Sequence, residues 1–227
     1  KQSAREVWPA DVLEHKVRRL AAELAGAGDM AAAAATCEPI EAWDAYAQLF
    51  LAQCPGWLQA GRLATIADGL HKLEHAPPAS IHAVRPALDA WHGIVATFQG
   101  DASAFGWLER SHHGHLERGE AAQALLAVVA RMDAHFLLWD QWHTAAAWAD
   151  ELERLFDQVG NALPRTLLIR VLSCGASMMF PCFGHRVVKR FAEQARTIVT
   201  TTNDPHEQLA LAGFVIGYGW IAAILPV

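Results

Sequence analysis

Residues 88–111, LDAWHGIVATFQGDASAFGWLERS, carry the pattern that decides the fold. Before the glycine, apolar residues recur at steps of three and four, which is the spacing of one helix face; they are Leu88, Trp91, Val95 and Phe98. Gly100 interrupts this pattern, and Asp101 precedes a second segment with apolar residues. Glycine suits the left-handed residue that ends a helix. The stretch therefore predicts a helical hairpin, two helices joined by a tight corner.

The same kind of corner recurs along the chain, and an internal repeat determines which architecture is expected. A glycine follows an apolar segment at Gly28, Gly61, Gly100 and Gly184, and a corner without glycine is expected near Trp142. These corners are 33 to 42 residues apart. One helical hairpin cannot cover its own apolar face, whereas stacked hairpins cover one another. We therefore expect an all-α fold, an α-solenoid of antiparallel helical hairpins wound as a tetratricopeptide-like right-handed superhelix.

The repeat pattern predicts a single domain over residues 1–227. The first helices of the hairpins are expected at 12–27, 41–60, 81–99, 120–141, 165–180 and 206–225. The second helices are expected at 30–37, 63–73, 102–116, 144–159 and 186–199. They combine into hairpins at 12–37, 41–75, 81–116, 120–159 and 165–199, followed by half a hairpin at 206–227.

The last segment, residues 209–227, carries no charged residue, so its length alone would allow it to span a membrane. Three glycines and the lack of a basic flank and of an aromatic belt argue against a span. We interpret the segment as the first helix of a sixth hairpin. We therefore expect no membrane contact, and we expect the chain to be a piece of a longer protein.

Composition narrows the classes of function. The formal net charge is −6, and no cluster of Lys and Arg interleaved with aromatics is present, which disfavours direct nucleic-acid binding by this segment. The cysteines are scattered and form no C-x-x-C pair, which indicates reduced core thiols and a cytoplasmic protein; they are Cys37, Cys54, Cys174 and Cys182. No phosphate-binding loop of the G-x-x-x-x-G-K-[S/T] type is present.

Three strings carry a resemblance to a known family: residues 13–34 (LEHKVRRLAAELAGAGDMAAAA), 57–73 (WLQAGRLATIADGLHKL) and 88–111. They resemble the helical region that follows the ATPase module in large bacterial LuxR-type and maltose-regulator-like transcriptional activators. They are also similar to the helical arrays of regulators with a bacterial transcriptional activator domain. The matching motifs lie at 15–29, 61–66 and 91–101, and the fourth corner departs from the family pattern because it lacks Gly-Asp.

The resemblance implies a non-enzymatic array that receives a signal or binds a protein. Such an array binds a small-molecule inducer or a regulatory protein on its concave surface and couples binding to assembly of the regulator, with self-association possible and no cofactor. The ATPase and DNA-reading modules would lie outside this chain. The alternative hypothesis is a stand-alone scaffold or adaptor. A third hypothesis, ranked below both, is a helical metalloenzyme that uses His112 and His115.

Polar and aromatic residues on the predicted first helices are candidates for ligand binding on the concave surface. They are Asp89, Trp91, His92, His135, Trp139, Asp140 and Arg170. For any single tryptophan, filling the space between helices is the favoured interpretation. No catalytic constellation of nucleophile, base and acid is identified in the chain.

Several histidine and cysteine pairs have the spacing of possible metal or redox sites. His112 and His115 lie one turn apart without a completing ligand, which favours a solvated helix end over a zinc site. His71 and His75 are expected on an exposed edge. Cys174 and Cys182 are expected as buried thiols, because no basic residue lies close by in the sequence to lower a thiol pKa. No metal site is therefore expected.

Overall fold

The computed structural model describes residues 8–224, and within this range the chain is all-helical, without a β-strand. The expectation of an all-α protein is thus confirmed. The chain divides into two compact units, an N-terminal unit that ends at Val95 and a C-terminal unit that begins at Ala96. The boundary lies inside helix α7 (Arg85–Gln99).

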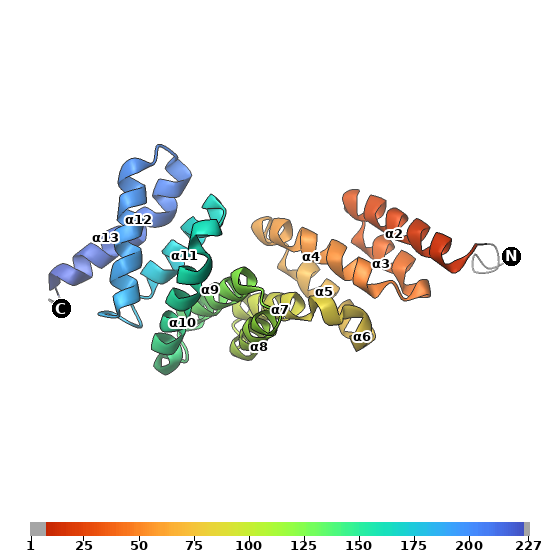
Figure 1. The fold of residues 1–227 in the computed structure, drawn as a ribbon, viewed down its shortest axis with the longest axis horizontal. Helices are drawn as coiled ribbons and strands as arrows, with labels where there is room; N and C mark the ends of the chain where they lie inside the picture. The colour runs from red at the N-terminus through yellow and green to blue at the C-terminus, as the bar shows by residue number, and fades with distance from the viewer. Residues whose placement is uncertain (1–7, 225–227) are drawn as a thin grey trace. The chain divides into compact units, whose positions relative to one another are not determined.

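The N-terminal unit, drawn red to yellow in Figure 1, is a succession of short helices. They are α2 (Ala10–Gly26), α3 (Met30–Cys37), η1 (Glu38–Ile40), α4 (Trp43–Gln59), α5 (Leu63–Glu74), α6 (Pro78–Ile81) and η2 (His82–Val84). Consecutive helices pack as pairs, α2 with α3 and α4 with α5. Helix α4 also packs against α2, the first helix of the preceding pair.

The core of the N-terminal unit is centred on aromatic residues of α4. Tyr46 and Phe50 are almost fully buried, and the ring of Phe50 lies against Trp57, with centroids 5.8 Å apart. Gly69 on α5 permits this packing, because a Cβ at that position would overlap the Phe50 ring. The close approach of α4 and α5 therefore depends on Gly69, although the backbone at this residue is ordinary α-helix.

The C-terminal unit, drawn green to blue in Figure 1, continues with longer helices. They are α8 (Ala104–Glu117), α9 (Ala121–Leu138), η3 (Trp142–Thr144), α10 (Ala145–Val159), η4 (Gly160–Ala162), α11 (Arg165–Ser177), α12 (Arg186–Thr201) and α13 (Pro205–Ile224). Helix α9 packs against α8 and α10, and α12 against α11 and α13. Helix α11 also packs against α9 and α13, so helices two elements apart contact one another.

The core of this unit contains the same kind of packing as that between α4 and α5, a phenylalanine ring against a helical glycine. Phe191 on α12 is fully buried and lies at Gly175 of α11, where a Cβ would overlap its ring. Phe156 of α10 meets Phe191 edge to face, with centroids 4.9 Å apart. Aromatic rings thus join α10, α11 and α12 through a position that only glycine can occupy.

All four predicted corner glycines have positive φ, and Gly28, Gly61 and Gly100 end their helices as predicted, whereas Gly184 lies in the connection that follows the end of α11 at Ser177. At the first three, the amide of the residue after the glycine donates to the carbonyl five residues back, as at Asp101 N to Ala96 O (2.9 Å). This is the Schellman pattern of helix termination. Sequence analysis missed Gly119, which ends α8 in the same way.

The corner between α9 and α10 has no glycine, as expected, and it uses non-glycine residues in the left-handed region instead. Trp139 has φ of 52° and Gln141 has φ of 54°. The helix predicted at 120–141 therefore ends at Leu138. A side chain in this region strains the backbone by about 1–2 kcal/mol, so other contacts must hold the corner.

Most predicted helix bounds agree with the structure within a few residues, and α3 matches the prediction at both ends. The helix predicted at 81–99 is wrong at its start, because α6 and η2 occupy residues 78–84 and α7 begins at Arg85. Pro86 follows at the second position of α7, where its missing N–H is not needed. The helix predicted at 165–180 ends earlier, at Ser177.

Among residues 8–224, α9 is the helix whose length and mean hydropathy of 1.4 would allow it to cross a membrane, and half of that window is buried inside the protein. This is the composition of a core helix that packs against neighbours on several sides. Helix α13 has a different distribution. Leu211 is fully buried, whereas Leu209, Ile216 and Trp220 expose 81%, 70% and 68% of their surface.

Candidate functional site

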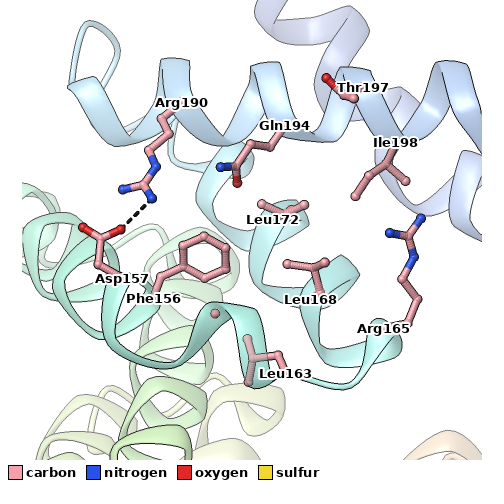
Figure 2. A pocket seen from close by; sticks show the side chains of 11 residues that line it. Phe156, Asp157, Leu163, Arg165, Leu168, Leu172, Arg190, Gln194, Thr197 and Ile198 are labelled. Carbon is pink, nitrogen blue, oxygen red and sulfur yellow. Dashed lines mark hydrogen bonds and ion pairs between the residues drawn. The ribbon is translucent and has the colours of Figure 1, made fainter.

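A groove of about 550 Å³ lies within the C-terminal unit, between α12 and the segment that runs from the end of α10 into α11 (Figure 2). Helix α10 ends at Val159, η4 follows, and the chain is extended at Leu163 before α11 begins at Arg165. This bend between two helices separates α10 from α11. The groove thus results from the connection between two hairpins.

Apolar side chains form the floor of the groove; they are Phe156, Leu163, Leu168, Leu172 and Ile198. Phe156 and Leu172 also belong to the buried core of the unit. Gly160 stands directly behind the ring of Phe156, where an added Cβ would lie 2.9 Å from Cε2. The floor is therefore continuous with the core, and its shape depends on the glycine at the end of α10.

The acidic and basic residues at one end of the groove form an ion-pair network. Arg190 Nη2 donates to Asp157 Oδ1 at 2.6 Å, and Nη1 donates to Glu153 Oε1 at 3.1 Å. The bond from Arg190 lowers the pKa of Asp157 and raises that of Arg190 itself. Figure 2 shows this pair bridging α12 and α10. Both groups are thus charged and matched to each other.

A second ion pair lies at the other end. The Arg165 guanidinium donates to both carboxylate oxygens of Glu207, at 2.8 Å each, and Thr202 Oγ1 donates to the same carboxylate at 2.7 Å. The arginine first, and the threonine second, lower the pKa of Glu207 to about 2. This arginine is therefore also matched by a carboxylate in a bidentate pair.

Gln194 is the polar side chain of the groove that makes no hydrogen bond to any residue in the described part of the chain. It is half-buried on α12, and Figure 2 shows its amide extending toward the apolar floor, between Arg190 and Ile198. An amide offers both a donor and an acceptor. The groove therefore combines an apolar floor, neutralised charges and one available hydrogen-bonding group.

The predicted surface residues on α7 take structural places in the N-terminal unit. Asp89 is buried and accepts from Arg85 Nε at 2.9 Å. Trp91 packs against the core of that unit. His92 is mostly covered, with Nε2 3.9 Å from Glu74 Oε1. Trp91 thus fills space in the core, which was the favoured interpretation for a single tryptophan, whereas Asp89 lies beneath the surface on which it was predicted.

The other four predicted residues lie near the end of α9, in the corner that follows it and on α11. His135 is fully buried, its Nδ1–H donates to the Asp140 carbonyl at 3.0 Å, and burial lowers its pKa. Trp139 is 67% exposed and meets Trp142 edge to face. Arg170 on α11 forms an ion pair with Asp133 of α9. Binding by this group stays a prediction, and His135 lies beneath the surface rather than on it.

The expectation of a solvated end at His112 and His115 is wrong, because both side chains are buried. His112 Nε2–H donates to Glu151 Oε1 at 2.7 Å, and burial lowers the His112 pKa. His115 Nδ1 lies 2.7 Å from Glu120 Oε2. The sequence did carry a signal: these histidines continue the stripe of Phe105 and Leu108 on the core face of α8.

No group of three or more His, Cys, Asp and Glu side chains is placed to hold a metal ion within residues 8–224. His71 and His75 are exposed as expected, with ring centroids 5.0 Å apart. The four cysteines are buried and free, as expected. Burial raises the pKa of Cys54 and Cys174 to about 12, which leaves these thiols unreactive.

Sequence analysis missed Arg131, an arginine buried on α9 with 3% of its surface exposed. Nη1 donates to the Phe105 carbonyl at 2.5 Å, and the guanidinium lies 4.4 Å from the centroid of Trp148. The nearest carboxylate oxygen, of Glu109, is 3.8 Å away, and burial lowers the Arg131 pKa. The signal was its helical spacing from Val128 and His135 on the buried face of α9.

No family model, no curated protein and no solved structure matches this chain. The likeness to LuxR-type and maltose-regulator-like activators therefore depends on the three sequence strings alone.

Proposed function

We propose that this chain is a non-enzymatic, signal-receiving or protein-interaction segment of a cytoplasmic bacterial transcriptional regulator. In this proposal the hairpins stack as a tetratricopeptide-like, right-handed α-solenoid, and binding of an inducer or a partner protein is coupled to assembly of the regulator. The chain itself contacts neither DNA nor membrane.

The packing within each unit supports the solenoid. Helix α4 contacts α2, and α11 contacts both α9 and α13, so within each unit first helices of neighbouring pairs meet. Stacked hairpins require such contacts, because each repeat buries its apolar face on the next. The repeated Schellman corners at Gly28, Gly61 and Gly100 support the same interpretation, since they turn the chain within two residues.

The observation that carries the binding function is the groove between α10 and α12. Its lining contains no histidine, cysteine or serine, and its arginines are engaged by carboxylates. Such a lining lacks a nucleophile paired with a base, whereas a concavity that combines an apolar floor with polar groups at its rim can bind a ligand. The groove therefore favours recognition over reaction.

Chromatin immunoprecipitation of the epitope-tagged, full-length gene product in its own cells tests the link to transcription. A regulator is expected to enrich a limited set of promoter segments, and a version that lacks the segment described here is expected to lose signal-dependent enrichment. Uniform background at all promoters would contradict the regulator and favour the stand-alone scaffold. Sequencing the complete reading frame gives an independent check, because a regulator should encode a DNA-reading module.

A further inference from the structure

We infer that the groove between α10 and α12 binds a neutral, amphipathic small molecule whose apolar part covers the floor and which exchanges a hydrogen bond with Gln194. This inference deepens the proposed function, since it names the class of signal that the segment would receive. It follows from the size of the groove, its floor, its charge balance and one unpartnered amide.

The volume of the groove and its apolar floor indicate the size of the ligand and the chemistry of its larger part. The volume of about 550 Å³ is in the range of sites that enclose drug-sized molecules. Leu163, Leu168 and Ile198 are only partly buried although they are apolar, so they still expose surface that a ligand can cover. Removing such surface from water favours binding of the apolar part of a ligand.

The ion pairs at both ends of the groove indicate that the ligand is neutral. Glu207 accepts from two nitrogens of Arg165, and Arg190 is shared by Asp157 and Glu153. An anionic ligand would have to compete with carboxylates that are already in place, and a cationic ligand would find each carboxylate already paired. Either charged ligand would lose hydration without gaining a free counter-charge.

The amide of Gln194 is the group that would make a hydrogen bond with the ligand. Its amide is half-buried and has no hydrogen-bond partner within residues 8–224. The other uncharged polar side chain of the lining, Thr197 on α12, is already engaged, because it donates to the Glu193 carbonyl. A partly desolvated amide gains most from a ligand that offers a carbonyl or hydroxyl at the edge of an apolar body. One such contact fixes the orientation of the ligand in the groove.

The experiment uses two naphthalene dyes as probes and the purified protein. Prodan is neutral and carries one carbonyl acceptor, whereas anilinonaphthalene sulfonate is an anion of similar size. We expect prodan to bind with a blue-shifted emission and to saturate at one molecule per chain. Its affinity is expected to stay unchanged between low and high salt, because no charge is neutralised. The anionic dye is expected to bind at least tenfold more weakly.

Two glutamine variants test the site. Gln194→Ala is expected to weaken prodan binding about fivefold to tenfold, the factor that corresponds to one neutral hydrogen bond. Gln123→Ala, which changes an exposed glutamine on α9 of the same unit, is expected to leave the affinity unchanged. Circular dichroism and the Tm of each variant establish that the fold is retained.

Three results would overturn the inference: no saturable prodan binding, tighter binding of the anionic dye, or equal affinities for the two glutamine variants. A dye could instead cover the exposed apolar residues of α13, so Trp220→Ala serves as a further control. Loss of binding in that variant alone would also overturn the inference. Because these titrations involve no DNA and no partner protein, they can fail while the regulator proposal survives, and the reverse also holds.

Discussion

The corner at Gly100 and the corner between α9 and α10 both turn the chain between two helices, but different forces hold them. At Gly100 the turn is local: the glycine has φ of 76°, and Asp101 both closes the Schellman bond and accepts from the Ser103 amide at 2.8 Å. Between α9 and α10, Trp139 and Gln141 occupy the left-handed region without being glycine.

The glycine-free corner is held by side chains of the buried face of α9. His135 donates to the Asp140 carbonyl from inside the core, and Arg131 Nη2 lies 3.4 Å from Gln141 Oε1. Arg131 also connects α8, through the Phe105 carbonyl, with α10, through the Trp148 ring. A helix corner can therefore be encoded either in two adjacent residues or in polar side chains that come from several helices.

The largest expected effect comes from removing the centre of that cluster. Arg131→Ala deletes a buried hydrogen bond and two ring contacts and leaves a cavity, so we expect the free energy of unfolding to fall by about 3 kcal/mol. Urea denaturation followed by circular dichroism measures it. Arg131→Met keeps most of the volume without a buried charge and should lose clearly less. Equal losses in both variants would show that the charge, not the volume, holds the cluster.

A smaller loss is expected where the corner is local. Gly100→Ala forces a Cβ into the left-handed region, and we expect a loss of about 1–2 kcal/mol. The matched control is Gly106→Ala on the exposed face of α8, where the backbone is helical and the added Cβ meets the nearest atom at 3.8 Å. This control should stabilise by about 0.5–1 kcal/mol. Unchanged stability of Gly100→Ala would contradict a corner that depends on the left-handed glycine.

The distributed corner should also respond to pH. Burial lowers the pKa of His135 below its ordinary value of 6.5, so the unfolded chain accepts a proton that the folded chain resists. Stability from this group is then complete above about pH 6.5 and declines as the pH falls below it, by at most about 1.4 kcal/mol per pH unit. Denaturation between pH 7 and pH 5.5 should show this slope, and His135→Gln should reduce it. A parallel slope in the variant would assign the effect to His112 instead.

The same contrast explains how much of the structure could be predicted from the sequence. Glycine corners and 3.6-residue periodicity act within a few residues, so three of the four glycine corners and most helix bounds followed from pattern alone. The prediction of a solvated helix end at His112 depended on the lack of a completing metal ligand, whereas the spacing of His112 from Phe105 and Leu108 marks a core face. The partner that makes its burial possible, Glu151, lies on another helix.

The groove could not be predicted in this way. Its floor and rim come from α10, α11 and α12, and Gln194 has no property in the sequence that distinguishes it from Gln123. Gln194 is a candidate for ligand binding because its amide has no partner and lies beside partly exposed apolar residues. Both features depend on how the helices pack against one another. Concave surfaces formed between hairpins are set by such contacts rather than by local pattern.

The smallest effect is expected from a substitution that relieves the backbone strain at the glycine-free corner. Gln141→Gly removes a Cβ from a residue with φ of 54°, which relieves about 1 kcal/mol or more of strain but adds backbone entropy to the unfolded chain and loses a 3.4 Å contact with Arg131. We expect a net gain of about 0.5 kcal/mol in urea denaturation. A clear loss would mean that the contact with Arg131 outweighs the strain, and that side chains beyond the backbone conformation determine this corner. Combining Gln141→Gly with Arg131→Ala isolates the contact with Arg131, because in that background the glycine no longer loses this contact and should stabilise more than it does alone.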